Sequence, residues 1–146
     1  MSQFIFQFEG NLAFDPELDF TKSGKAVCRL RVVHNRRRRN AEGQWEDAAP
    51  MFVAVSAWGD LAERCAELEK GNTVNIDARD VDVWPFLRQD GTPGAILQAN
   101  ASNVALSMRF TGAKALPKQT PDPDKWSFDD EEPRDQDQER ELAMAG

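Results

Sequence analysis

Flat aromatic side chains at alternate positions of one apolar segment are the residues in this sequence best suited to bind a ligand. Phe52 and Trp58 share one parity of residues 51–58, and only Ala54 and Ser56 lie between them on that parity. In a strand, alternate residues point to the same side, so the small side chains would leave both rings open. An open ring can stack on any nucleobase, which contributes roughly 1–3 kcal/mol. We predict that both rings lie bare on a binding surface, the alternative being burial under a loop or a partner subunit.

Basic residues lie close to these rings in the sequence. Two arginines occupy the polar parity of an apolar segment, and four consecutive arginines follow within the polar residues 35–50. Cations that follow backbone phosphates, interleaved with rings that hold bases, suit a binder of single-stranded nucleic acid that tolerates any sequence. The candidate nucleic-acid-binding residues are Phe52, Trp58, Trp84, Phe86, Trp45, Arg29, Arg31, Arg36, Arg37, Arg38 and Arg39.

Catalytic and metal-binding arrangements have little support in the sequence. The only histidine, His34, has no cysteine or serine nucleophile beside it, and no glycine-rich phosphate loop is present. The acidic pairs Asp15/Glu17 and Asp80/Asp82 could share a divalent metal, but such pairs are common in loops and edge strands. We therefore predict no enzyme, no cofactor and no metal site.

The two cysteines and the amino terminus bear on the compartment. Cys28 and Cys65 lie in apolar stretches without partners at metal-ligand spacing, so we expect two reduced, buried thiols. The sequence has no basic stretch followed by an apolar run at its start, and no window approaching ~18 consecutive apolar residues. We expect a cytoplasmic protein that does not contact membranes.

Charge is distributed unevenly along the chain, whose formal net charge is −7 with a pI near 4.7. Residues 113–146 hold ten acidic and five basic side chains, a net charge of −5, whereas residues 1–112 hold 15 and 13, a net charge of −2. A polyanion would meet the local cluster of arginines, not the chain average. We predict one binding domain over residues 1–112 and a disordered acidic tail over residues 113–146, which has too little apolar content to fold.

The periodicity of apolar residues predicts the elements that must position the candidate residues. Alternation predicts five strands, over residues 3–14, 26–33, 51–58, 74–87 and 95–106. Helical spacing predicts one short helix over residues 60–69. Turns are expected around residues 15–16 and 22–24, a long loop over 35–50 and a hairpin tip over 88–94. This order predicts an all-β protein: a five-stranded OB-fold barrel with one short helix between its third and fourth strands.

Short motifs along the body resemble the bacterial single-stranded DNA-binding proteins in order and spacing. The similar segments are residues 10–12, 15–18, 21–24, 26–27, 32–33, 52–59, 61–63 and 70–74, so the resemblance covers about residues 3–110. It implies an OB-fold that assembles, usually as a homotetramer. It also implies a nucleoid-associated protein that wraps single-stranded DNA during replication, recombination and repair, without a cofactor.

The resemblance also implies roles for particular residues. Phe52 and Trp58 match family aromatics on which bases stack, and Trp84 or its neighbour Phe86 matches the aromatic of the hairpin. The stretch that holds the four arginines and Trp45 corresponds to a loop that touches DNA in the family.

Two segments depart from the family pattern. The stretch Ala78-Arg79-Asp80 stands where the family commonly has Gly-Arg-Leu, which bears on the geometry of the hairpin. The family's tail ends in an acidic tip that recruits other genome-maintenance proteins, and its counterpart here is internal because the chain runs on to Gly146. The candidate partner-docking residues are Phe128, Asp129, Asp130, Glu131, Glu132 and Pro133.

The leading hypothesis is a domain that binds and protects single-stranded DNA with little sequence preference, attached to a solvated tail. A second hypothesis is an OB-fold accessory factor of the primosome or protein-interaction type with weak DNA binding, which the acidic tail and the Asp80/Asp82 pair favour. A third is a small metal-dependent nuclease.

Overall fold

Eight strands and one helix make up the part of the chain that the computed structural model describes, residues 2–117. In chain order they are β1 (Ile5–Leu12), β2 (Glu17–Phe20), β3 (Ala26–His34), β4 (Arg37–Arg39), β5 (Trp45–Asp47), β6 (Met51–Trp58), α1 (Asp60–Cys65), β7 (Thr73–Leu87) and β8 (Pro93–Leu106).

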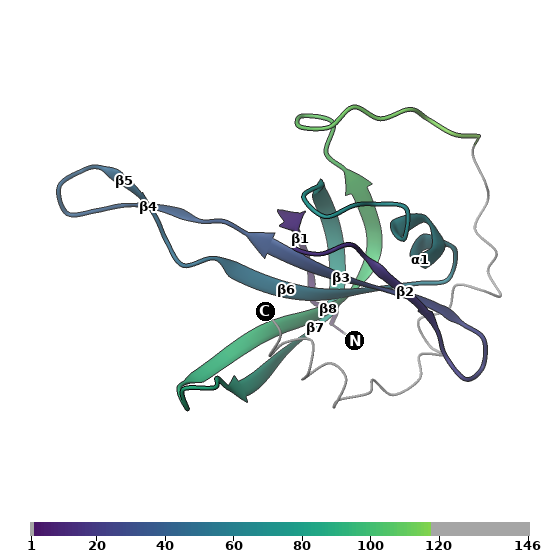
Figure 1. The fold of residues 1–146 in the computed structure, drawn as a ribbon, viewed down its shortest axis with the longest axis horizontal. Helices are drawn as coiled ribbons and strands as arrows, with labels where there is room; N and C mark the ends of the chain where they lie inside the picture. Colours follow the sequence, from purple (N-terminus) through teal and green to yellow (C-terminus); the bar gives the residue numbers. More distant parts are fainter. Residues whose placement is uncertain (1, 118–146) are drawn as a thin grey trace.

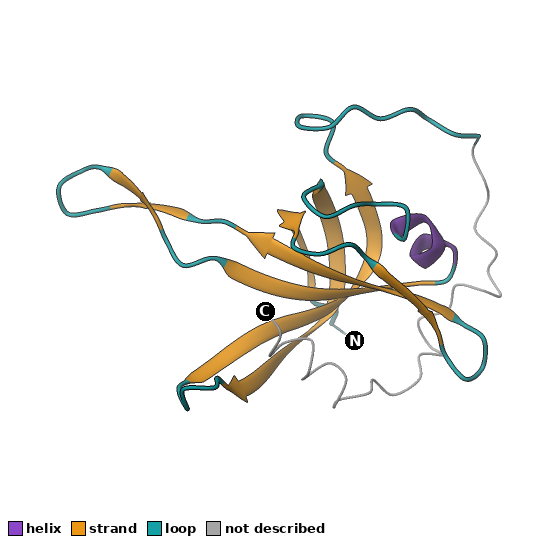
Figure 2. Cartoon of the chain, in the orientation of Figure 1, coloured by secondary structure: helices purple, strands orange, loops and turns teal. Residues whose placement is uncertain are grey.

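Six of the strands form one curved sheet that closes on itself (Figures 1 and 2). The strand order is β1-β7-β8-β6-β3-β2, and β1 also pairs with β3 through Asn11↔Val33 and Leu12↔Val32. All pairs are antiparallel except β6 with β8. Gly10 lies at this closure, where an added Cβ would stand 2.5 Å from Val32 Cγ1, so only glycine lets β1 cross β3 so closely.

Alternation in β3 and β6 places one parity in the core and the other on the outer face, as predicted. Cys28 and Val32 of β3 and Val53 and Ala57 of β6 have no exposed surface. Apolar side chains on one face of a strand gain stability from burial, and the register of the sheet follows from that face. The opposite parity is thereby free to carry function.

Helix α1 covers one end of the barrel (Figure 2). It stands between β6 and β7 in the chain, which is the place predicted for it. Ala62 and Cys65 are buried, and Leu61 packs against the core from a half-buried position. The helix is shorter than the predicted span of 60–69, because after Cys65 the chain continues in turns that run to Gly71.

Two regions differ from the predicted elements. Glu17–Phe20, which follows a predicted turn, forms β2 and pairs with β3 along all four residues, but it is exposed throughout. The predicted loop over residues 35–50 instead contains the two-stranded β4–β5 sheet, which we call the arm. Figure 1 shows the arm projecting from the ends of β3 and β6. Neither region has a buried face. The arm lacks apolar alternation, whereas Glu17–Phe20 alternates polar and apolar residues over only four positions, which is a weak signal for a strand.

An irregularity in β7 sets the direction of the β7–β8 hairpin. The pairing of β7 with β8 shifts register between Arg79 and Asp82, and Asp80 adopts a φ of +55°. This is a β-bulge, which bends the strand and increases its twist. It falls at the stretch that departs from the family pattern.

The observed order of strands and helix is that of an OB-fold barrel, with β2 and the arm added to the predicted elements. The described residues include no helix long and apolar enough to cross a membrane.

Candidate nucleic-acid interface

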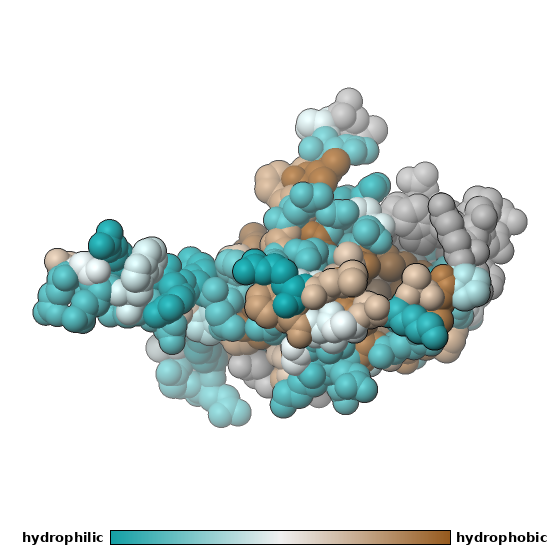
Figure 3. Space-filling view, turned by 90° about the horizontal axis from the view of Figure 1, so that it is seen from above, coloured by the Kyte–Doolittle hydropathy of each residue, from teal (hydrophilic) through white to brown (hydrophobic). Residues whose placement is uncertain are grey.

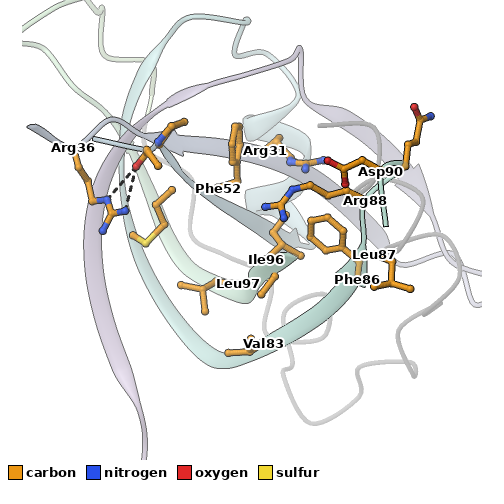
Figure 4. A pocket seen from close by; sticks show the side chains of 15 residues that line it. Arg31, Arg36, Phe52, Val83, Phe86, Leu87, Arg88, Asp90, Ile96 and Leu97 are labelled. Atoms are coloured by element: carbon orange, nitrogen blue, oxygen red, sulfur yellow. Dashed lines mark hydrogen bonds between the residues drawn. The ribbon is translucent and has the colours of Figure 1, made fainter. Parts of the chain in front are cut away.

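A groove of about 740 Å³ runs over the outer face of the barrel between the root of the arm and the β7–β8 hairpin. Its wall on β3 and β6 includes Arg31 and Phe52, and its wall on the hairpin includes Phe86 and Arg88. Figure 4 shows these side chains pointing toward the cavity, with Arg36 on its opposite side. The groove therefore brings together residues that lie far apart in the sequence.

Two aromatic rings in the groove each have a guanidinium over them. The Cζ atom of Arg31 lies 5.7 Å from the centroid of the Phe52 ring, and Cζ of Arg88 lies 5.7 Å from that of Phe86. Both rings are half-buried. A cation at this distance is attracted to a ring face, and a nucleobase could take the place of the guanidinium on that face.

Gly94 lets the Phe86 ring lie across the hairpin. Phe86 pairs with Gly94 in the ladder of β7 and β8. A Cβ atom added at Gly94 would stand 2.9 Å from both Phe86 Cζ and Arg88 Cζ. The absent side chain thus makes the space that the ring and its guanidinium occupy.

The floor and the far wall of the groove combine apolar and basic side chains. Ile96 is buried, whereas Val83 and Leu87 on the hairpin are 58% and 66% exposed. Arg36 donates from Nε and Nη2 to the carbonyl oxygen of Ala49, at 3.3 and 3.2 Å. These bonds hold the guanidinium at the root of the arm.

Trp58 does not lie bare, so the prediction of an open ring is wrong for this residue. It is 8% exposed, its Nε1–H donates to Asn100 Oδ1 at 3.2 Å, and Lys25 Nζ lies 5.3 Å from its ring centroid. At the end of β6 the ring is covered by neighbouring elements, and its indole N–H finds the partner that a buried tryptophan needs. Phe52, at the other end of β6, stays half-buried in the groove.

Trp84 lies beside the groove and is half-buried. It pairs with Ile96, a floor residue, and it does not line the cavity itself. Phe86 is the hairpin aromatic that lines the groove, which favours it over Trp84 as the counterpart of the family's hairpin ring.

The arm is polar along its length, and Figure 3 shows mostly hydrophilic residues on its visible face. Trp45 is 62% exposed. Arg37 and Arg38 form ion pairs with Asp47 and Glu46 of β5, at 3.5 and 2.8 Å. These acidic neighbours offset part of the positive charge that the arginine run brings to the arm.

Arg39 and Arg29 have protein partners too. Arg39 Nε donates to the carbonyl oxygen of Gly43 at 3.0 Å. Arg29, on β3, pairs with Asp19 of β2 at 3.8 Å. Arg31, one step along the same face, is half-buried, and burial lowers the pKa of its guanidinium.

The cysteines are buried and free, as predicted. Burial raises the pKa of the Cys28 thiol to about 11 and that of the Cys65 thiol to about 12. Thiols in this state are protonated and poor nucleophiles. Among residues 2–117, no three His, Cys, Asp or Glu side chains gather where they could hold a metal ion.

Sequence reasoning misses Arg88 and the exposed apolar pair Val83 and Leu87. Arg88 falls in the predicted hairpin tip, but it is two residues beyond Phe86, so strand periodicity could have placed it on the same face. No sequence pattern assigns Val83 and Leu87 to a groove, because the groove depends on the direction that the bulge gives to the hairpin. The candidate docking residues 128–133 lie outside the described residues.

Comparison with known proteins identifies the family. Residues 4–105 match the model of the single-strand binding protein family. The chain belongs to this family. A single-stranded DNA-binding protein of Corynebacterium glutamicum is 36% identical over 114 residues, which are 77% of this chain and 49% of that protein. One from Thermus thermophilus is 47% identical over 76 residues, which are 51% of this chain and 27% of that protein.

The chain spans about half the length of the Corynebacterium glutamicum relative, and 64% of a Mycolicibacterium smegmatis relative that is 32% identical. The crystal structure of a small single-stranded DNA-binding protein from Streptomyces coelicolor has the same fold, with a TM-score of 0.61 at 20% identity. The similarity between the two structures covers 76% of this chain and all of the Streptomyces coelicolor chain. The family match covers the barrel strands, and the solved structure shares their fold.

Proposed function

We propose that residues 1–112 bind and protect single-stranded DNA with little sequence preference. The observation that carries the proposal is the groove, where two half-buried phenylalanine rings each lie under a guanidinium. Phe52 and Phe86 would stack on bases, and the arginines would hold phosphates. The names of the relatives and the family match support the same reading.

The groove also suits single strands better than a duplex. In a duplex the faces of the bases are stacked on one another and unavailable to protein rings, whereas a single strand can turn them outward. Arg31, Arg36 and Arg88 line the same cavity and would neutralise backbone phosphates along one path. Trp45, Trp84 and the other arm arginines would extend that path beyond the groove.

This function implies a wider role, which we propose with it. A protein of this kind acts in the cytoplasm at the nucleoid, where replication, recombination and repair expose single strands. We propose that it is a binding protein without catalytic activity or cofactor. It would assemble with further copies, as a homotetramer, and residues 128–133 would dock replication or repair proteins.

Titration with labelled oligo(dT) and with a duplex of equal length tests the proposal. We expect fluorescence anisotropy to show tight binding of the single strand, weak binding of the duplex, and weaker binding of both as salt rises. Quenching of tryptophan fluorescence should accompany binding, because Trp45 and Trp84 lie on or beside the path. Equal affinity for both forms, or no binding at low salt, would contradict the proposal and favour the accessory-factor hypothesis. Cleavage of the oligonucleotide in magnesium would instead indicate a nuclease.

A further inference from the structure

A second cavity lies on the same outer face as the groove, toward β2, and an exposed aromatic ring stands on its rim. This cavity of about 70 Å³ is lined by Phe14, Arg29, Arg31, Ser56 and Gln98, among others. Phe14 lies between β1 and β2 and is 49% exposed. Exposure alone does not set this ring apart, because several other large apolar side chains are as exposed, but Phe14 also lines a cavity that contains arginines.

The floor of this cavity is built from aligned neighbours on three strands. Arg31 of β3 pairs with Ala54 of β6, and Ala54 pairs with Gln98 of β8. Arg29 and Ser56 form the next pair toward β2. Paired residues point to the same side of a sheet, so the small side chains on β6 leave a hollow between the arginines and the amide.

The cavity and the groove share one lining residue. Arg31 lines both, and its guanidinium lies over the Phe52 ring of the groove. A strand whose phosphates contact Arg31 would therefore pass from Phe52 and Phe86 into the second cavity. OB-folds bind oligonucleotides over this part of the barrel, including the loop between the first two strands of the chain.

The segment that carries Phe14 is fixed on both sides of the ring. The backbone N–H of Ala13 donates to the carbonyl oxygen of Arg31 at 2.9 Å. The N–H of Lys70 donates to Asp15 Oδ1 at 2.8 Å, which engages that carboxylate. A backbone held on both sides of Phe14 limits the positions that its ring can take, so less conformational entropy is lost on binding.

Charge sets the orientation of a ligand in the second cavity. Asp15 and Glu17 line the cavity near Phe14, whereas Arg29 and Arg31 line it on β3. Phosphates would be repelled by the carboxylates and attracted to the guanidiniums, so the backbone lies on the arginine side and a base lies toward the ring.

We propose that Phe14 is a third stacking platform, on which one further base of the same single strand rests while Arg29 and Arg31 hold its phosphates. This inference rests on the proposed function and extends it to a subsite toward β2. Phe14 thereby lengthens the strand that one barrel binds.

Substitution of Phe14 tests the inference against Phe20, a matched control. Phe20 is 57% exposed on β2 but pairs with Ala26, on the core parity of β3, so it faces away from the groove. We expect Phe14→Ala to weaken binding of labelled oligo(dT) about 5- to 150-fold, the range for loss of one stacked base, and Phe20→Ala to bind like the unaltered protein. Urea unfolding of each variant confirms that the barrel is intact.

Two more variants separate stacking from packing. Phe14→Trp keeps a flat ring, so we expect it to keep the affinity, and DNA should quench the fluorescence of the new indole. Phe14→Leu is apolar but has no ring, so we expect it to bind as weakly as Phe14→Ala. The inference is overturned if Phe14→Ala loses no more affinity than Phe20→Ala, or if Phe14→Leu binds as tightly as the unaltered protein. In either case the proposed function stands as long as the unaltered protein binds oligo(dT). If the unaltered protein binds no single strand, both fail.

Discussion

At the scale of single residues, the two rings of β6 have different environments although they share a face of the strand. Phe52 is half-buried in the groove beside Arg31, and Trp58 is 8% exposed with its indole N–H bonded to Asn100. Periodicity assigns both to the outer face, which is right. It cannot tell that Lys25 and Asn100 contact the ring at one end of that face, because both come from other parts of the chain.

Trp58 is expected to contribute more to stability than to DNA binding. Trp58→Phe removes the bond to Asn100, whose side chain is 1% exposed, and leaves a buried acceptor with less hydrogen bonding. We expect urea unfolding to show a loss of about 1–3 kcal/mol, with the affinity for oligo(dT) unchanged.

Trp45→Phe is the control, since Trp45 is 62% exposed and its replacement should leave the free energy of unfolding unchanged. A Trp58→Phe variant of normal stability that binds DNA poorly would show that this ring contacts DNA after all.

At the scale of elements, the arm holds three arginines of the run but does not present them all as free charge. Arg37 and Arg38 pair with Asp47 and Glu46 across the β4–β5 ladder. All four side chains are substantially exposed, so the pairs contribute little to stability, about 0–1 kcal/mol each. The sequence predicts the basic stretch. The ion pairs depend on the pairing of β4 with β5, which places Arg37 and Arg38 opposite Asp47 and Glu46 and is seen only in the structure.

Removal of the acidic partners should tighten DNA binding. We expect Glu46→Gln with Asp47→Asn to raise the affinity for oligo(dT) at low salt, because two guanidiniums become available to phosphates, and the gain should fade as salt rises. Anisotropy titrations over a range of salt concentrations measure both effects.

Glu63→Gln with Glu67→Gln provides the matched control, because these residues are exposed in and just after α1 and the change in net charge is the same. An equal gain in the control variant would mean that net charge, not the arm, governs affinity.

The remaining elements show where sequence reasoning succeeds. The parities of β3 and β6, the place of α1 and the two long strands of the hairpin follow from apolar periodicity, because each has a face in the core. The four residues of β2 escape prediction because none is buried, and the bulge at Asp80 because it depends on pairing with β8. The groove could not be predicted for the same reason, because the bulge sets the direction of its hairpin wall.

At the scale of the whole molecule, charge divides the chain into a nearly neutral body and an acidic tail. Residues 113–146 carry a net charge of −5 and residues 1–112 a net charge of −2. We expect these tethered acidic groups to compete with DNA for the arginines of the body. Salt would weaken the competition, because it screens charges over about 10 Å at 0.1 M.

Truncation after Gly112 should therefore tighten the binding of oligo(dT) at low salt and have little effect at high salt. A chain that keeps residues 113–146 but has their acidic residues replaced by Asn and Gln separates charge from length, and it should match the truncated protein. Unchanged affinity of the truncated protein at low salt would show that the tail does not compete.

The central claim is that the molecule holds single-stranded DNA on the two rings of its groove, and paired ring deletions measure this most directly. Phe52→Ala with Phe86→Ala should weaken oligo(dT) binding by about 2 kcal/mol or more. Phe4→Ala with Phe110→Ala removes two rings that are 69% and 61% exposed outside the groove, one of them under the Arg109 guanidinium, and should leave affinity unchanged. A folded Phe52→Ala/Phe86→Ala protein that binds oligo(dT) as tightly as the unaltered chain would contradict the account.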